Sequence, residues 1–268
     1  LRELHRKHKE KEVMGELARG LANAANIYGE ANNFEKMEDY LKELRELHRK
    51  HKEKEVMGEL AKGLANAANI YGKANNFEKM EDYLEELTGL HEKYKEIEVR
   101  IQLARGLYNA ANIYRQANNF EKMEDCLEEL TGLHEKHKEK EVRIPLARGL
   151  ANITVYYGEA NNFEKMEDCL EELTGLHEKH KEKEVRIPLA RGLANAANIY
   201  GEANNFEKME DYLKKMIELH EKYKEKEVRI PLAISLSNCM KYFEAIKDIH
   251  IIINLLYRLR FDLPADPN

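Results

Sequence analysis

A period of 43 residues runs through almost the whole chain and limits what it can fold into. Residues 20–41, GLANAANIYGEANNFEKMEDYL, return with few changes from Gly63, Gly106, Gly149 and Gly192. Residues 5–47 and 48–90 differ at only five positions. A fixed period of this length indicates stacked supersecondary units, each of which buries its apolar face against its neighbours. We therefore expect a repeat protein with one continuous core.

Each unit carries the pattern of two helices. The first helix has a stripe of large apolar residues beside a stripe of small ones: Leu17, Leu21, Ala24 and Tyr28, and Ala18, Ala22, Ala25 and Gly29. A turn at Asn32 and Asn33, residues that suit turns and caps, leads to a second helix that begins near Phe34. We expect three later copies to open their first helix with proline, which loses no hydrogen bond there: Pro145, Pro188 and Pro231.

The spacing of large and small residues also carries a family resemblance. The signature positions are Leu21, Ala24, Ala25, Tyr28, Phe34, Met37, Leu41 and Leu44, with Asn-Asn-Phe-Glu-Lys at the turn. In this spacing the chain resembles a tetratricopeptide repeat protein of the long-repeat kind found in kinesin light chains. It departs from that signature in having no Trp at Leu21, Ala25 for Gly and Met37 for Ala. The period alone also allows HEAT or armadillo repeats.

We predict an all-α fold, a right-handed α-solenoid of helix–turn–helix repeats with a 43-residue period. Residues 1–12 are expected to be the tail of a truncated repeat, and residues 13–227 to form five repeats. Residues 228–268 form a diverged C-terminal repeat that acts as a cap or a contact surface. Within it, residues 246–261 are apolar nearly all round, which suggests burial on two sides.

Composition excludes several classes of function. The net charge of −6 is mild and no basic block indicates nucleic-acid binding. We find no signal-peptide pattern and no span that would cross a membrane. Three cysteines are too few for a disulfide framework, so we expect reduced thiols and a cytoplasmic protein. No unrepeated nucleophile, acid pair or phosphate loop is visible before residue 229, and we expect no enzyme and no cofactor.

One face of each first helix is polar and lies beside the core stripes. It has a cation followed by two asparagines, or by one in the fourth copy, where Val155 takes the second place. We call this set the polar stripe: Arg19, Asn23 and Asn26; Lys62, Asn66 and Asn69; Arg105, Asn109 and Asn112; Arg148 and Asn152; Arg191, Asn195 and Asn198. The resemblance implies that first helices line an inner wall. On that wall the stripes would form a ladder of amides beside a row of cations.

Such a ladder has a physical use. An Asn amide can accept from a backbone N–H and donate to a backbone carbonyl of an extended peptide. A helix spacing of about 8–10 Å matches about three extended residues of roughly 3.3 Å each. The cations would favour carboxylates on the ligand. We therefore predict a protein-interaction scaffold that binds an extended or helical segment of a partner protein. The row of cations would favour an acidic segment. Recent duplication would also preserve such a stripe without any use.

Two other readings remain open. Pairs such as His5 with His8 and His134 with His137 lie on one helix face, but Tyr replaces the second His at Tyr94 and Tyr223. We expect packing there and no native metal site. A self-assembling structural protein is the alternative function, because open solenoid ends can join head to tail into oligomers or filaments. Homo-oligomers would then form through the C-terminal helix.

Overall fold

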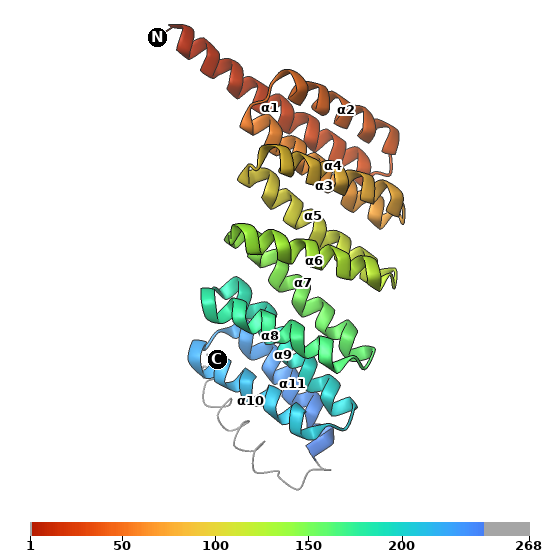
Figure 1. Cartoon of the computed structure of the whole chain (residues 1–268), viewed down its shortest axis with the longest axis vertical. Coiled ribbons are helices and arrows are strands. Elements are labelled where there is room, and N and C mark those ends of the chain that lie inside the picture. Colours follow the sequence, from red (N-terminus) through yellow and green to blue (C-terminus); the bar gives the residue numbers. More distant parts are fainter. Residues whose placement is uncertain (1, 244–268) are drawn as a thin grey trace, which may run out of the picture. The chain divides into compact units, whose positions relative to one another are not determined.

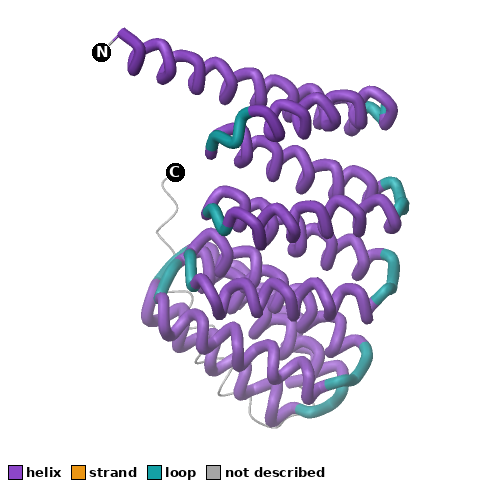
Figure 2. The backbone as a smooth tube through the Cα atoms, turned by 45° about the horizontal axis from the view of Figure 1, so that its top comes forward, coloured by secondary structure: helices purple, strands orange, loops and turns teal. Residues whose placement is uncertain are grey.

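A computed structural model describes residues 2–243, and these residues form helices joined by short loops (Figures 1 and 2). The apolar segment at residues 246–261 lies outside the described residues. The helices are α1 (Arg2–Glu30), α2 (Phe34–Lys50), α3 (Lys54–Lys73), α4 (Phe77–Tyr94), α5 (Ile97–Gln116), α6 (Phe120–His137), α7 (Lys140–Glu159), α8 (Phe163–His180), α9 (Lys183–Glu202), α10 (Phe206–Tyr223) and α11 (Lys226–Phe243). The prediction of an all-α solenoid of helix–turn–helix repeats is confirmed.

The two asparagines of each turn do different work. Asn32 has φ 58°, the left-handed conformation that ends a helix, and its N–H bonds to the Gly29 carbonyl at 2.9 Å. Asn33 bonds back to the Tyr28 carbonyl and caps α2, accepting from the Lys36 N–H at 3.2 Å. The same pattern recurs in every later turn, at Asn75, Asn118, Asn161 and Asn204 and at Asn76, Asn119, Asn162 and Asn205.

The chain divides into two compact units, Leu1–Leu146 and Ala147–Asn268, which we call unit 1 and unit 2. In unit 1 each first helix packs on the next, α1 on α3 and α3 on α5, while α2, α4 and α6 pack on their own hairpin partners. In unit 2, α9 packs on α8, α10 and α11. Both packings fit the repeat principle, in which a helix pair covers the core of its neighbour.

The core of unit 1 follows the predicted stripes. Leu60, Leu64 and Ala67 are at most 3% exposed, and so are Met80 and Leu87 of the second helix. Each fully buried Leu contributes about 1.5–3 kcal/mol. The small stripe permits close approach, since a Cβ on Gly29 would lie 2.6 Å from the Ile70 side chain. Gly29 therefore leaves room for the Ile70 side chain of the next repeat, although the third repeat carries Arg115 at the same position.

Two local expectations differ from the structure. Residues 1–12 were expected to end a separate helix, but α1 is continuous from Arg2 to Glu30. The three prolines do not open their helices: α9 begins at Lys183, so that Pro188 is its sixth residue, and Pro145 and Pro231 lie inside α7 and α11. The first helix gains an extra turn before the proline because Val185 and its counterparts are fully buried and hold that turn in the core.

A row of buried arginines replaces methionine at the start of the later first helices. Met57 of α3 becomes Arg100 in α5 and Arg186 in α9, which are 6% and 5% exposed. Arg100 pairs with Glu139, and Arg186 bonds to Glu225 at 2.6 Å. Each guanidinium also donates to a carbonyl at the end of the preceding second helix, Lys95 at 3.3 Å or Lys181 at 3.1 Å. These arginines therefore stabilise the loops between repeats through hydrogen bonds to both sides.

Candidate functional site

The structure places the predicted polar stripe on one side of the first helices, beside the buried stripes. Arg19 and Asn23 of α1 are exposed, as are Arg148 and Arg191, while Lys62 and Arg105 are partly buried. The remaining asparagines are also partly buried: Asn26, Asn66, Asn69, Asn109, Asn112, Asn152, Asn195 and Asn198. We call the side of each unit that carries these residues its first-helix face.

In unit 1 the cation of one repeat bonds to the asparagine of the repeat before it. Lys62 Nζ donates to Asn23 Oδ1 at 3.4 Å, and Arg105 Nη2 donates to Asn66 Oδ1 at 2.6 Å. Each bond joins two first helices across a repeat junction. Because the amide oxygen already accepts from the cation, the amide NH₂ is the group left to donate to a ligand. Asn23 and Asn66 are thus oriented by the cations of the next repeat.

The second row of asparagines serves the fold. Asn112 Nδ2 donates to the Tyr108 carbonyl of its own helix at 2.8 Å. Asn198 Oδ1 accepts from Ser235 Oγ at 3.2 Å across a repeat junction. Asn112 and Asn198 are thus bonded within the fold. The first row, which includes Asn23, Asn66, Asn109 and Asn195, is therefore the better candidate for ligand contacts.

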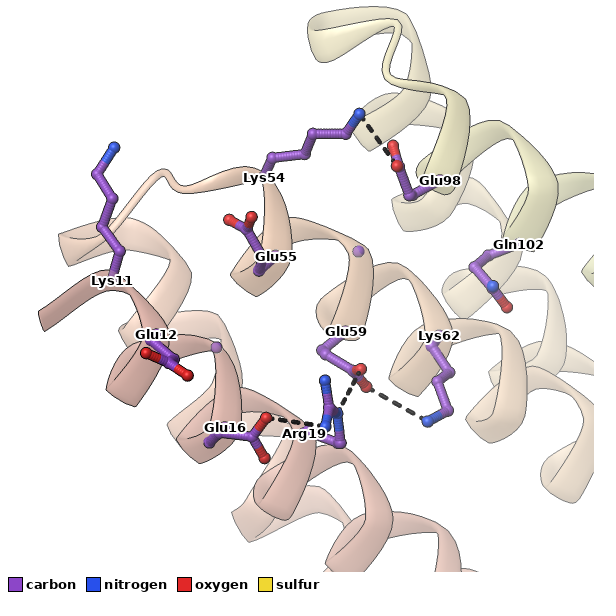
Figure 3. A pocket seen from close by; sticks show the side chains of 12 residues that line it. Lys11, Glu12, Glu16, Arg19, Lys54, Glu55, Glu59, Lys62, Glu98 and Gln102 are labelled. Carbon is purple, nitrogen blue, oxygen red and sulfur yellow. Dashed lines mark hydrogen bonds and ion pairs between the residues drawn. The ribbon is translucent and has the colours of Figure 1, made fainter. Parts of the chain in front are cut away.

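A groove of about 600 Å³ crosses α1, α3 and α5 on the first-helix face of unit 1 (Figure 3). Charged side chains of both signs line it. Arg19 pairs with Glu16 at 2.8 Å and with Glu59 at 3.5 Å, and Lys62 pairs with the same Glu59 at 3.4 Å (Figure 3). The two stripe cations of this groove are therefore already neutralised. Sequence reasoning overlooked these glutamates, although Glu16 stands three residues before Arg19, the spacing of a helical ion pair.

The neutralising glutamate disappears further along the chain. The position of Glu16 and Glu59 holds Gln102, Pro145, Pro188 and Pro231 in the later repeats. Arg105 bonds to an amide instead of a carboxylate, and burial lowers the pKa of its guanidinium. Within residues 2–243, neither Arg148 nor Arg191 makes an ion pair or hydrogen bond. The later cations therefore keep uncompensated positive charge, which is the property that attracts a carboxylate.

A second groove, of about 510 Å³, lies between α9 and α11 in unit 2. It combines the uncompensated cation Arg191 with two amides, with Glu227, which pairs with Lys183 at 2.9 Å, and with apolar side chains. The amides are Asn195 and Asn198, and the apolar residues are Ala194, Ile187, Ile230, Pro231 and Ile234. Ile230 and Ile234 are 46% and 55% exposed. Ile234 takes the position of the stripe cation, and Ile230 takes the position of Gly15 in the first repeat. This groove can therefore hold an apolar side chain and a carboxylate side by side.

Other kinds of site find little support in the part of the chain that the structure describes. No three His, Cys, Asp or Glu side chains between residues 2 and 243 form a group that could hold a metal ion. Cys126, Cys169 and Cys239 form no disulfide with one another. None of the described helices is long and apolar enough to cross a membrane.

Comparison with known proteins agrees with this architecture. The tetratricopeptide repeat family model matches residues 104–137 and 190–223. Among solved structures, BtubC (BKLC) from P. vanneervenii is similar, with 14% identity, coverage of 85% of this chain and 91% of that chain, and a TM-score of 0.53. An engineered protein, Northeast Structural Genomics Consortium target OR329, has 26% identity, coverage of 85% and 90%, and a TM-score of 0.51. No curated protein sequence matches the chain.

The fold and the stripe on its first helices define a helical-repeat protein. The tetratricopeptide repeat family model matches two of its repeats, in agreement with the resemblance that the spacing of Leu21, Tyr28 and Phe34 carries. The 34-residue segment 104–137 that matches begins in α5 and ends with α6, so one match covers one helical hairpin.

Proposed function

We propose that this chain is an interaction scaffold that binds an extended acidic segment of a partner protein on its first-helix faces. Tetratricopeptide repeats generally mediate protein–protein interaction. The observation that carries the finer proposal is Arg191, an exposed cation without an ion pair among the described residues, in the groove that also exposes Ile230 and Ile234. The ligand would therefore combine a carboxylate with an apolar side chain.

The contacts that we propose use three kinds of group. The Arg191 guanidinium would pair with a ligand carboxylate in a charge-assisted hydrogen bond. The neighbouring Asn195 amide, which has no recorded partner within residues 2–243, would bond to the peptide backbone. An aliphatic or aromatic side chain of the ligand would cover Ile230 and Ile234. Since helix packing already holds all of these groups, little ordering would accompany binding.

A selection experiment tests this proposal without a known partner. A random peptide library displayed on phage would be selected against the intact chain, and we expect enriched peptides to carry Asp or Glu beside a large apolar residue. Arg191→Glu should reduce binding of those peptides by more than about tenfold, because one charged hydrogen bond of about 1.5–3 kcal/mol is lost and replaced by repulsion. Asn109→Ala, Asn152→Ala and Asn195→Ala together should weaken binding further and leave the helical content unchanged.

Arg19→Glu is the matched control. It alters the same repeat position, but Glu16 and Glu59 already neutralise Arg19. We expect this variant to bind the selected peptides as the parent does. Equal loss in both variants, or selected peptides without any acidic preference, would show that Arg191 is not the recognition element.

Self-association is the second candidate function, and a different observation favours it. Val13, Leu17 and Ile27 of α1 are 52%, 47% and 64% exposed, whereas Val56, Leu60 and Ile70 at the same positions of α3 are at most 8% exposed. In α3 these side chains are covered by a helix pair of nearly the same sequence. A second copy of this chain contains the same helix pairs and could cover α1. Light scattering over a concentration series distinguishes a growing assembly from a fixed species.

A further inference from the structure

First helices inside the units carry a glycine notch that receives two leucines from the second helix before it. A Cβ atom on Gly63 would lie 3.1 Å from Leu41 Cδ2 and 3.3 Å from Leu44 Cδ2. Two other glycines at this repeat position meet leucine pairs in the same way, Gly106 with Leu84 and Leu87 and Gly192 with Leu170 and Leu173. Gly20 holds the same position in α1, and no described atom of another helix lies within 4 Å of a Cβ placed there. The notch at Gly20 can therefore still receive a pair of leucines.

A charged contact joins neighbouring second helices at the same kind of junction. Arg45 of α2 donates to Glu86 of α4 through Nε at 2.8 Å and through Nη2 at 2.7 Å. Its guanidinium also lies over the Tyr83 ring, 5.4 Å from the centroid. Glu43 holds the position of Glu86 in α2, where it is exposed, and within residues 2–243 it makes no ion pair or hydrogen bond. Glu43 can therefore accept from an arginine that arrives together with the two leucines.

The sequence holds a second segment with these leucines and this arginine in the same order. In α2 they follow one another as Leu-x-x-Leu-Arg over residues 41–45, and the pattern occurs in the chain only once more, at residues 256–260. Residues 256–260 stand five repeat periods after residues 41–45 and lie outside the described residues. Arg2 stands one period before Arg45, but it belongs to α1 itself and lies 18 residues from Gly20 on that helix. Residues 256–260 thus carry the groups that would complement Gly20 and Glu43.

We propose that a second copy of this chain docks on the face formed by α1 and α2 through its residues 256–260. The two leucines of the second copy enter the notch at Gly20, as Leu41 and Leu44 enter the notch at Gly63. Arg260 of the second copy pairs with Glu43. This docking is a specific form of the self-association given above as the second candidate function, on which it rests. Since the two surfaces differ, the contact is heterologous and can continue from copy to copy.

The contact between copies should be weaker than a junction inside a unit. Ile253 stands at the position of Glu38, which accepts from two tyrosine hydroxyls of the next repeat at 2.7 and 2.6 Å. Glu244 stands at the position of Gly29, which leaves room for an isoleucine of the next repeat. The second copy therefore brings fewer of the contacts that join repeats within the chain. We expect a reversible association whose extent depends on concentration.

Light scattering of the full chain over a concentration series tests the notch. The mass of the parent should rise with concentration, and Gly20→Leu should stay monomeric at those concentrations because its side chain fills the notch. Gly89→Leu is the matched control, since a Cβ on Gly89 of α4 also meets no described atom within 4 Å and lies outside the proposed contact. This control should associate as the parent does. A parent that is monomeric at every concentration overturns self-association as a whole, whereas a Gly20→Leu variant that associates like the parent overturns this contact alone.

An exchange of charges tests the ion pair. Glu43→Arg and Arg260→Glu should each weaken association by at least about tenfold, because a charge-assisted hydrogen bond is replaced by repulsion. The double variant again has opposite charges at the contact and should recover most of the association of the parent. Circular dichroism checks the helical content of every variant. If the folded double variant associates as weakly as the single variants, Arg260 does not pair with Glu43 and the proposal fails.

A mixture of two blocked chains tests the direction of the contact. Gly20→Leu blocks the α1 face, and Leu256→Glu with Leu259→Glu blocks the segment that docks on it, so each chain alone should be monomeric. Together they keep one intact pair of surfaces and should form a dimer with one copy of each chain that grows no further. A mixture of folded chains that stays monomeric, at concentrations where the parent associates, would refute the head-to-tail contact.

Discussion

At the scale of single residues, the repeated asparagines have several separate roles. Asn32 and its counterparts take a left-handed conformation, Asn33 and its counterparts cap the next helix, and Asn23 and Asn66 bond to stripe cations. The sequence predicted the turn and the polar stripe from residue type and spacing. It could not predict which hydrogen-bond partner each amide would have, because that partner lies in the neighbouring repeat.

Buried histidines at the repeat junctions make stability depend on pH. His48 and His177 pack edge-on against Tyr94 and Tyr223, with centroids 5.4 Å apart in both pairs. Burial lowers the pKa of both, and together with the nearby Arg186 it lowers the pKa of His177 to about 4. In the unfolded chain the pKa of His is about 6.5. Between these values the unfolded chain binds more protons than the folded one.

We therefore expect the free energy of unfolding to fall as the pH drops from about 6.5 to 4, and to change little above 6.5. The contribution of His177 alone should be about 1–3 kcal/mol. Urea unfolding at several pH values measures this dependence. His177→Phe keeps an aromatic ring against Tyr223 but removes the titration, so its pH dependence should be shallower. The same slope in parent and variant would show that His177 does not contribute.

At the scale of the elements, the second helices could be predicted closely and the first helices less so. The Asn-Asn-Phe turn marks the start of α2, α4, α6, α8 and α10 directly, because the capping hydrogen bond joins residues close in sequence. Pro188 suggested a helix start by its own preference, but burial of Val185 extends α9 toward the N-terminus. Packing against another repeat therefore overrides the preference of proline for a helix start. The sequence pattern of a single repeat does not contain this packing.

The caps of α6 offer a matched pair of substitutions. Asn119→Ala removes the acceptor for the Lys122 N–H and should lower the free energy of unfolding by about 1 kcal/mol. Asn118 has φ 56°, a conformation that glycine adopts without strain, so Asn118→Gly should leave stability within a few tenths of a kcal/mol or raise it. Urea unfolding of both variants checks the pair. Equal losses would contradict the two separate cap roles.

The prolines of unit 2 link helix stability to the proposed binding. Pro188 cannot donate a backbone hydrogen bond within α9, and it leaves Arg191 without the glutamate that Arg19 has. Pro188→Glu with Pro231→Glu should raise the free energy of unfolding by about 1 kcal/mol or more, because backbone bonds are restored. The new carboxylates should also neutralise Arg191. We expect peptides selected by the parent to bind this variant at least about tenfold more weakly.

The control for that variant is Pro188→Ala with Pro231→Ala. Alanine restores the backbone bonds but brings no charge, so stability should rise while peptide binding stays close to that of the parent. Thermal unfolding and fluorescence polarisation with a labelled peptide measure the two effects separately. If both double variants lose binding equally, the shape of the prolines rather than the charge of Arg191 holds the peptide.

At the scale of the whole molecule, what is shared between repeats defines the fold, and what differs between them defines the candidate sites. The period, the two core stripes and the turn made the helical-repeat solenoid predictable from sequence. The groove in unit 2 has Pro231 where the groove in unit 1 has Glu59, and Cys126 stands where the preceding repeat has Tyr83. Those changes are visible in the sequence, but their meaning depends on partners about 40 residues away, such as Glu38 for Tyr83.

The first repeat allows a test of self-association that separates it from folding. Val13 and Val56 occupy the same position, but Val56 is fully buried and Val13 is 52% exposed. Val56→Glu should lower the free energy of unfolding by at least about 3 kcal/mol, because it places an unpaired charge in the core. Val13→Glu should change the stability of a monomer by no more than about 0.5 kcal/mol.

Light scattering, which measures molecular mass, then tests whether the α1 face mediates assembly. If the α1 face joins a second copy, the parent should grow in mass with concentration, and Val13→Glu combined with Leu17→Glu should stay monomeric, because two charges would have to be buried in the contact. The double variant must keep the parent's helical content for this comparison. If the parent is monomeric at every concentration, self-association through the α1 face is excluded. Binding on the first-helix faces then stands as the function to pursue.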